Sequence, residues 1–366
     1  LGLAQEGQRF ATATALTNAR KKLKTSAFIE LNQRSLDTFQ KQFPAQEKWH
    51  GFRLLGIDGS KLELPNEPEI WEHFGLLNNH DRPSGLLSTL YDLNHHLWLD
   101  TNLTPLTKGE REHAVDHLAY TKEGDLLIYD RGYPAFWLFA LHQCLKRDFC
   151  MRLPYNLYKE STDFYLSDEP ERTILLKPSK QAEKECRKRD LPVTPLTLRL
   201  IRVQLDSGET EILITSLLDV ERYPVGIFKD LYHRRWGHEE GYKHIKIHAE
   251  LQNWTGKSLH SVFQDLHAKA LTLNLAAMHM MAAKERVEKK TKHRKHLYQI
   301  NRVQALSKMK DLIVRIFHAA DPETWIPNLS MAMANDVLPV RKGRKFARKQ
   351  RPGVGTRYRP AYKRGR

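Results

Sequence analysis

The spacing of apolar positions changes several times along the chain, and each change marks an expected element. Residues 8–45 place apolar side chains at helical intervals between basic ones, which predicts short helices. From residue 52 onward short apolar runs replace this pattern and predict strands, in the order 52–57, 61–64 and two within 85–99. The first half of the chain therefore begins as helices and continues as an antiparallel meander.

The pattern between residues 108 and 153 alternates between helix and strand. The expected elements are a helix over 108–120, a buried strand over 126–129, an apolar helix over 134–147 and a strand over 149–153. The order that we interpret from these segments is β-β-β-α-β-α-β, which is that of the ribonuclease H-like core. We therefore expect an α/β fold with a ribonuclease H-like catalytic core.

The rest of the chain predicts an insertion and more helices. Residues 155–223 are rich in strands, with a hairpin around Asp206-Ser207-Gly208, and a long helix is expected over 224–247, begun by Pro224. Two further helical stretches follow at 258–289 and 302–319. The expected parts are a helical N-terminal part (1–48), the first part of the core (49–154), a β-rich insertion (155–223), the core completion with C-terminal helices (224–335) and a basic tail (336–366).

Two of these parts allow more than one interpretation. The helices of residues 1–48 suit either a module that binds DNA ends or an appendage that packs on the core, because no turn chemistry singles out a recognition helix. The chain begins at Leu1 instead of Met, from which we expect a missing N-terminal portion.

The distribution of charge along the chain favours binding to nucleic acid. The formal net charge is +16, and residues 341–366 hold 12 of the 59 Lys and Arg and none of the 43 acidic residues, which leaves +4 for the remainder. Such a tail neutralises phosphates and gives salt-sensitive binding without sequence preference. The alternative is a solvated tail for solubility or localisation. With 40% hydrophobic and 28% charged residues the body is an ordinary folded domain.

Several classes of protein are disfavoured. Cys144, Cys150 and Cys186 form no CxxC pair, so neither a disulfide framework nor a thiolate zinc site is indicated, and a reducing cytoplasm fits. The most apolar stretch, 270–283, is too short to span a membrane and is interrupted by polar residues. No secretory signal is visible. We expect a bacterial cytoplasmic protein associated with the nucleoid, with no membrane partner.

Two aspartates follow apolar strands. Asp58 lies in the sequence GIDGS, where small neighbours leave space for an ion and a DNA backbone; its alternative is a hairpin turn, for which Asp-Gly is a strong signal. Asp130 follows the strand 126–129 in YDRGYP, at the carboxyl end where open sheets place functional groups. Its alternative is a helix cap ahead of Pro134.

A stripe of polar side chains follows on the helix expected over 224–247. The stripe consists of Tyr232, Arg235, Glu239 and Lys246. These positions fall within an arc of roughly 60° on a helix with about 100° per residue. The alternative is a solvated face on which Arg235 and Glu239 form an i,i+4 ion pair. The stripe gains weight because it follows two strand-end aspartates in the order that the fold requires.

Phosphodiester chemistry explains why these residue types belong together. Two Mg²⁺ ions about 3.5 to 4 Å apart need hard oxygen ligands, and they activate the attacking oxygen and stabilise the leaving one. Asp58, Asp130 and Glu239 can hold them, with Mn²⁺ as a substitute. Arg235 and Lys246 would then clamp phosphates, the former with two parallel hydrogen bonds. Tyr232 could donate a hydrogen bond to phosphate.

These residues resemble those of the DDE transposases of the bacterial IS-four insertion-sequence family. That family carries Tyr-x2-Arg-x3-Glu-x6-Lys around its catalytic glutamate, which corresponds here to YHRRWGHEEGYKHIK and selects Glu239 over Glu240. GIDGS and YDRGYP are similar to the surroundings of its two aspartates, and the resemblance covers about residues 10 to 350. It implies catalysis by Asp58, Asp130 and Glu239.

The resemblance also implies partners and a reaction. A homodimer would bind transposon ends and target DNA and move the element by cut and paste. Some relatives form a hairpin on the transposon end and hold a flipped base on tryptophan, for which the candidates here are Trp137, Trp236 and Trp254. We therefore predict Mg²⁺-dependent strand cleavage by water and then attack of the freed 3′ hydroxyl on target DNA.

Three alternatives remain at this point. One is a catalytically inactive DNA-binding protein derived from a transposase, against which the intact triad argues. The second is a nuclease on the same fold that cuts without joining. The third is a zinc site at His244, His248 and the pair His95-His96, which lacks the Glu of an HExxH pattern and a third ligand. We interpret these histidines as surface or phosphate-facing residues.

Overall fold

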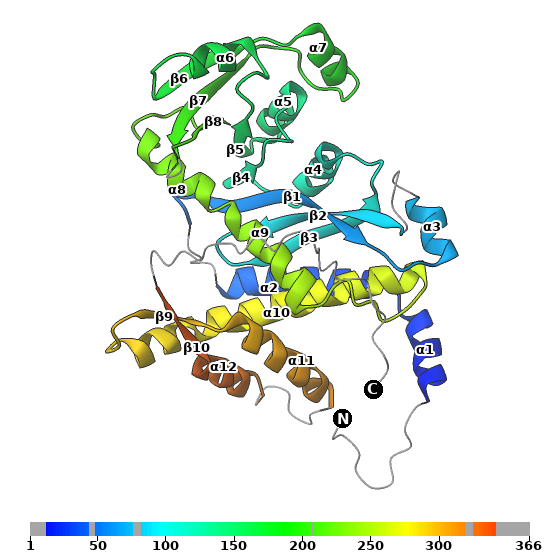
Figure 1. The fold of residues 1–366 in the computed structure, drawn as a ribbon. Coiled ribbons are helices and arrows are strands. Elements are labelled where there is room, and N and C mark those ends of the chain that lie inside the picture. The colour runs from blue at the N-terminus through cyan, green and yellow to red at the C-terminus, as the bar shows by residue number, and fades with distance from the viewer. Residues whose placement is uncertain (1–11, 44–47, 76–81, 206–207, 319–324, 342–366) are drawn as a thin grey trace, which may run out of the picture.

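The main feature of the molecule is one large sheet. The computed structural model describes residues 12–43, 48–75, 82–205, 208–318 and 325–341. Within them an eight-stranded sheet has the order β3-β2-β1-β4-β5-β8-β7-β6 (Figure 1). Its strands are β1 (Arg53–Glu63), β2 (Ser84–Asp92), β3 (Leu97–Pro105), β4 (Asp125–Tyr129), β5 (Asp148–Leu153), β6 (Glu171–Leu176), β7 (Leu196–Gln204) and β8 (Thr210–Thr215).

The first five strands form the expected core. β1, β2 and β3 pair antiparallel, while β4 pairs parallel to β1 and β5 parallel to β4. Parallel strands need crossovers, and these are supplied by the helices α4 (Glu110–Leu118) and α5 (Phe136–Leu145). Every residue of β2 and β4 is buried, as expected for strands covered on both faces. The α/β ribonuclease H-like fold class and the predicted order of the core strands are confirmed, with one short helix, α3 (Pro68–Phe74), inserted between β1 and β2.

The prediction of two separate strands around Asp58 is wrong. β1 runs without interruption, and Asp58 lies in its interior opposite Thr89 of β2. The hairpin turn considered for Asp58-Gly59 is therefore wrong as well, although Asp-Gly is a common turn pair. The reason is tertiary: β2 runs alongside β1 from Leu55 to Glu63, and this pairing holds the Asp-Gly pair extended.

The segment 155–223 extends the main sheet. β8 pairs antiparallel with β5, β7 with β8 and β6 with β7, so the β-rich segment continues the core sheet at its edge. The expected hairpin is formed by β7 and β8, and residues 206–207 of its turn lie outside the described residues. Three helices here and earlier were not expected because each is too short to show a helical period: α3 (Pro68–Phe74), α6 (Lys159–Tyr165) and α7 (Lys180–Arg187).

The helix expected over 224–247 is a series of short helical segments. They are η1 (Val225–Ile227), α8 (Phe228–His233), α9 (Trp236–Lys243) and the π-helix η2 (His244–His248). The turn between α8 and α9 is tight, since the amide of His238 bonds to the carbonyl of Arg235 at 2.9 Å. The π-helix is wide, because the amide of Ala249 reaches the carbonyl of His244 at 2.8 Å. Such wide turns are frequent at functional sites.

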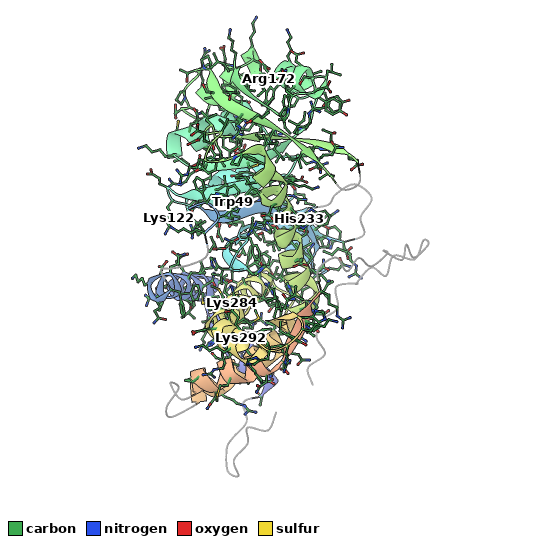
Figure 2. The ribbon with its side chains drawn as sticks, turned by 90° about the vertical axis from the view of Figure 1, so that its left-hand side faces the viewer. Trp49, Lys122, Arg172, His233, Lys284 and Lys292 are labelled. Carbon is green, nitrogen blue, oxygen red and sulfur yellow. The ribbon has the colours of Figure 1, made fainter. Side chains whose placement is uncertain are left out.

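Helices cover the β1–β3 end of the sheet. The 33-residue α10 (Leu259–Thr291) lies beside α2 (Thr25–Gln42), which follows α1 (Ala13–Lys22) (Figures 1 and 2). The Asn274 side chain bonds both to Asn32 of α2 and to the carbonyl of Trp98 in β3, each at 2.7 Å. Arg20 of α1 likewise pairs with Asp265 at 2.8 Å. These contacts show that the N-terminal helices pack on the core, whatever else they bind.

The C-terminal part continues below α10 in Figure 1. It consists of β9 (Leu297–Ile300), α11 (Arg302–His318), α12 (Trp325–Asn335) and β10 (Val337–Val340). β10 pairs antiparallel with β9, so the first residues of the expected tail 336–366 form a strand. Residues 342–366, which carry the predicted basic tail, lie outside the described residues. No helix in the described ranges has the length and apolar character to cross a membrane.

Candidate active site

The register of two parallel strands brings Asp58 and Asp130 together. In β1 and β4, Gly56 is the partner of Ile128. Asp58 and Asp130 each lie two residues further along, so the two carboxylates occupy the same level on neighbouring strands. Adjacent strands are about 4.8 Å apart. The fold alone therefore places two acidic side chains side by side.

Asp58 is a half-buried carboxylate that forms no ion pair within the described residues. Its Oδ1 accepts a hydrogen bond from the Gly59 amide at 2.8 Å. Burial raises the pKa of Asp58 to about 6, and the nearby charges of Glu110 and Asp130 act in the same direction. The Gly59 hydrogen bond and the Arg235 charge oppose this rise without cancelling it. The site accordingly favours binding of a cation.

Asp130 has the opposite electrostatic surroundings. Its side chain is 41% exposed, and its Oδ1 accepts a hydrogen bond from the Tyr232 hydroxyl at 3.1 Å. Burial opposes its ionisation, but the Arg131 amide, the Arg235 charge and the Tyr232 bond together lower its pKa. Arg152 adds to this effect from 4.0 Å. Asp130 follows β4 and precedes α5 by several residues, so the helix-cap alternative is wrong, since Ala135 occupies the cap position.

Arg235 and Glu239 form an ion pair on α9. Arg235 Nη2 lies 3.0 Å from Glu239 Oε1, as the i,i+4 spacing allows. The Glu239 side chain is 43% exposed, whereas that of Arg235 is only 11% exposed. The Arg235 guanidinium carbon lies over the rings of Tyr232 and Trp236, at 5.6 and 6.0 Å from their centroids. The Arg235 Nε atom is buried and has no hydrogen-bond partner among the described residues. One donor of the guanidinium is therefore unused.

Lys246 reaches β1 from the π-helix. Its Nζ donates to Ser60 Oγ at 2.5 Å and to the Lys61 carbonyl at 3.0 Å, just beyond Asp58 on the same strand. Burial lowers its pKa, and the Asp58 charge opposes this change. Tyr232, by contrast, directs its hydroxyl to Asp130. Two residues of the stripe, Tyr232 and Lys246, therefore contact the edge of the sheet that carries both aspartates.

Glu110 is a further carboxylate at this edge. Its oxygens lie 2.8 Å from the position of a Cβ on Gly59 and 3.3 Å from that of a Cβ on Gly132, the glycines that follow the two aspartates. Burial and then the Asp130 charge raise its pKa. The space expected around GIDGS is thus filled by protein side chains: Glu110 occupies it at Gly59, and His238 occupies it at Gly56. The sequence gives no sign that Glu110 belongs to the site, because Glu is common in the first turn of a helix.

The donor chemistry at this edge fits a divalent hard cation only in part. Carboxylate oxygens are the ligands that Mg²⁺ prefers, and Asp58 forms no ion pair within the described residues. Across the described ranges, however, no three His, Cys, Asp or Glu side chains stand close enough together to hold a metal ion. The two aspartates are neighbours, and Glu239 is engaged with Arg235.

The three candidate tryptophans differ in exposure. Trp137 and Trp254 are buried, the latter with its indole N–H bonded to the Glu63 carbonyl. Trp236 is 47% exposed and lies beside Arg235. Only Trp236 of the three presents an accessible ring in this structure.

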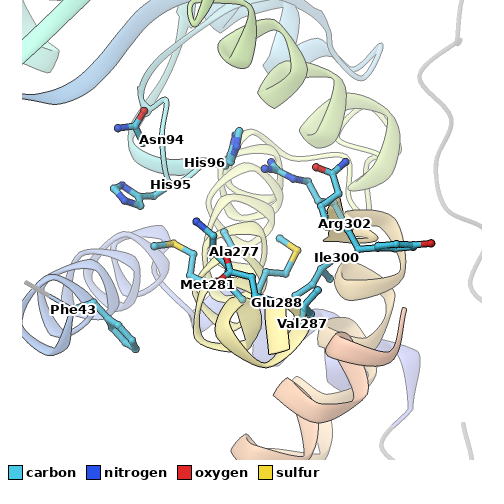
Figure 3. A pocket seen from close by; sticks show the side chains of 14 residues that line it. Phe43, Asn94, His95, His96, Ala277, Met281, Val287, Glu288, Ile300 and Arg302 are labelled. Atoms are coloured by element: carbon cyan, nitrogen blue, oxygen red, sulfur yellow. The ribbon is translucent and has the colours of Figure 1, made fainter. Parts of the chain in front are cut away.

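The four histidines considered for a zinc site have different surroundings. His95 is buried and bonded to Asp92 at 3.0 Å, so its interpretation as a surface residue is wrong. His95 and His96 line a pocket of about 520 Å³ together with residues of α10, β9 and Arg302 (Figure 3). None of the six predicted site residues lines that pocket. His244 and His248 lie one turn apart, with ring centroids separated by 5.1 Å.

The comparison with a family model decides the affiliation. Residues 49–275 match the model described as transposase DDE domain. The chain belongs to this family. The transposase InsG for insertion sequence element IS4 of Escherichia coli (strain K12) is 25% identical over 358 residues, which cover 94% of this chain and 78% of that protein. The predicted affiliation with IS4-type DDE transposases and the predicted function as a DNA transposase are confirmed.

Two solved transposase structures show a weaker likeness. A piggyBac transposase synaptic complex with hairpin DNA is 9% identical over 83% of this transposase chain and 59% of that chain, with a TM-score of 0.44. A Mos1 transposase paired-end complex with a left transposon end is 11% identical over 52% of this chain and 59% of that chain, with a TM-score of 0.21. The ribonuclease H-like fold is therefore assigned from the order of the strands and not from these two structures.

Proposed function

We propose that this transposase carries out cut-and-paste transposition with Asp58, Asp130 and Glu239 as its catalytic carboxylates. The observation that carries the proposal is the register of β1 and β4, which sets two aspartates side by side, with Asp58 in no ion pair among the described residues. These three residues would hold Mg²⁺, or Mn²⁺ in its place, which supplies Lewis-acid activation of water and of the scissile phosphate. Glu239 would turn from Arg235 toward the two aspartates when the site is loaded.

Arg235 and Lys246 would hold the DNA backbone. The Arg235 Nη2 group that now bonds Glu239 would donate to a phosphate oxygen once Glu239 turns to the aspartates, because the buried Nε atom is out of reach of DNA. Lys246 uses two of its three N–H donors on β1, so one remains for phosphate. Tyr232 would orient Asp130 by its hydrogen bond instead of contacting phosphate directly. Trp236 is the ring available for an unpaired base.

The partners would be transposon ends and target DNA, bound by a homodimer in the bacterial cytoplasm at the nucleoid. The excess of basic residues in 341–366 supports affinity for the DNA backbone. The sequence of events is hydrolysis at the element's end, followed by attack of the released 3′ hydroxyl on a target phosphodiester.

The test is cleavage of a supercoiled plasmid that carries the element's own ends, with Mg²⁺ or Mn²⁺ added. The wild-type protein should excise the element, Glu239→Gln should bind the ends without cutting, and the exposed neighbour Glu240→Gln should cut like the wild type. Tight binding without cleavage by the wild type in either metal would instead establish an inactive DNA-binding protein. Cleavage without any joined product would establish a nuclease.

A further inference from the structure

A chain of buried hydrogen bonds connects helix α9 with the strand that carries Asp58. His238 Nε2 lies 2.7 Å from Thr89 Oγ1, and Thr89 Oγ1 lies 3.0 Å from the Tyr242 hydroxyl. The Tyr242 hydroxyl in turn lies 2.6 Å from the main-chain carbonyl oxygen of Asp58. His238 immediately precedes Glu239, so this chain runs from beside one proposed catalytic carboxylate to the backbone of another.

The direction of these hydrogen bonds is fixed by their last acceptor. A carbonyl oxygen can only accept, so the Tyr242 hydroxyl donates to Asp58 and must itself accept from Thr89. Thr89 has then used its only proton, and His238 must donate from Nε2. This leaves His238 Nδ1 without a proton, in agreement with its lack of a partner among the described residues. The Tyr242 hydroxyl also lies 3.3 Å from the Leu87 carbonyl oxygen, and because both carbonyl oxygens can only accept, the order of donors along the chain is the same.

Ring stacking and two glycines hold α9 close to the sheet. The His238 ring stacks on Tyr91 at 5.2 Å and on Tyr242 at 5.1 Å, with interplanar angles of 14° and 3°. A Cβ on Gly56 would lie 2.8 Å from His238 Nδ1, and one on Gly241 would lie 3.0 Å from the Tyr91 ring. Such distances are too short for ordinary packing, so the helix approaches β1 and β2 as closely as glycine permits.

We propose that His238, Thr89 and Tyr242 form a positioning bridge that sets the separation of Glu239 from Asp58. The proposal rests on the catalytic role proposed above for those two carboxylates. The Glu239 side chain is 43% exposed, and its described ion pair is with Arg235 of the same helical segment. Its position relative to Asp58 therefore depends on where the backbone of α9 lies. The positioning bridge ties that backbone directly to the Asp58 carbonyl.

The polar nature of the bridge argues against simple core filling. Apolar side chains of similar size would fill the same space but would tolerate sliding of the helix along the sheet, whereas a fully donor-matched chain specifies one register. A displacement of about 1 Å can reduce an enzymatic rate by roughly 100-fold, so a fixed register matters for the chemistry.

The test removes the shared hydroxyl with little change in shape, by Thr89→Val. Mn²⁺ affinity of the DNA-free protein, measured by electron paramagnetic resonance, and the single-turnover cleavage rate on pre-bound DNA should each fall by roughly 10-fold to 100-fold, as for other supports of metal ligands. The dissociation constant for transposon-end DNA should stay unchanged. Thr89→Ser should restore both quantities. Tyr242→Phe, which keeps the ring stack, should resemble Thr89→Val and covers the case in which that variant does not fold.

Ser88→Ala is the matched control. Ser88 Oγ also bonds a buried histidine, His117 Nε2, at 3.0 Å, but on the other face of β2, because successive strand residues alternate. Its loss should lower stability without altering Mn²⁺ affinity. The bridge is overturned if Thr89→Val and Tyr242→Phe retain Mn²⁺ affinity and cleavage within twofold of Ser88→Ala. A wild-type protein that binds Mn²⁺ without cutting DNA would overturn the proposed function alone, and loss of that affinity in Thr89→Val would still support the bridge.

Discussion

The hydroxyl of Tyr232 donates a hydrogen bond to Oδ1 of Asp130 at 3.1 Å, across 102 residues of sequence. The first residue of the helical stripe therefore contacts the second aspartate. This bond also connects the α8 segment with the end of β4. Burial opposes ionisation of Asp130, and this bond acts with the Arg131 amide and the Arg235 charge to lower its pKa nevertheless.

Tyr232→Phe should raise the pKa of Asp130, because the carboxylate form loses a donor while the ring and its packing remain. Carbon-13 NMR of labelled aspartates in the metal-free protein measures this pKa directly, and the Asp130 carboxyl should titrate at higher pH than in the wild type. Tyr120→Phe, which changes an exposed tyrosine elsewhere, is the control. An unchanged Asp130 pKa in Tyr232→Phe would contradict a role of Tyr232 through Asp130.

The sequence predicts the neighbourhood of the two aspartates because parallel strands fix it. Once the strands over 52–57 and 126–129 are adjacent and parallel, residues just after them must share an edge, and the register of Gly56 with Ile128 has this effect. The same applies to the stripe, whose spacing follows from the helical repeat. These parts of the site depend only on local periodicity and one topological rule.

Other parts depend on contacts that no local pattern contains. Asp58-Gly59 is extended because β2 lies alongside it, and Glu110 joins the site because glycines stand at positions 59 and 132. The tight turn at His238 and the π-helix that carries Lys246 are adjustments of α9 to the sheet, and an ideal helix does not predict them. Tertiary packing decides each of these features.

Asp58→Asn should stabilise the metal-free protein at pH 8. A carboxyl whose pKa is raised from 3.8 to about 6 by burial loses folded-state stability as the pH rises through that value. At about 1.4 kcal/mol per unit the gain from removing the charge is at most about 3 kcal/mol above pH 7, and it should vanish below about pH 4. Urea unfolding at both pH values without divalent ions measures it. Asp130→Asn is the contrast: the pKa of Asp130 is lowered, so its ionised form stabilises the fold, and the variant should be less stable at pH 8. A gain for Asp58→Asn that is equal at pH 4 and pH 8 would contradict this account.

Arg235→Lys should weaken both end binding and cleavage although the charge is retained. A lysine has one compact cationic group and lacks the planar fork by which Arg235 bonds Glu239, contacts the Tyr232 ring and would offer N–H donors to a phosphate. Loss of one hydrogen bond to a charged group corresponds to roughly 10-fold to 100-fold in affinity. Fluorescence anisotropy with transposon-end DNA and single-turnover cleavage measure the two effects. Arg234→Lys is the control, because Arg234 is partly exposed and pairs with Asp230. Unchanged binding and turnover in Arg235→Lys would exclude the proposed clamp.

Removal of residues 341–366 should flatten the salt dependence of DNA binding. The segment holds 12 basic and no acidic residues, and each phosphate that a basic side chain neutralises contributes about 0.9 to the slope of log affinity against log salt. The slope should therefore decrease in magnitude by several units if most of these residues contact the backbone, while cleavage of pre-bound ends at low salt should persist because the three carboxylates are untouched. Titrations of end DNA and of unrelated duplex at several salt concentrations separate the two effects, since loss of a sequence-blind contact weakens both duplexes equally. An unaltered slope would show that the DNA backbone is neutralised by residues 1–340, whose net charge of +4 would then have to be concentrated on one face.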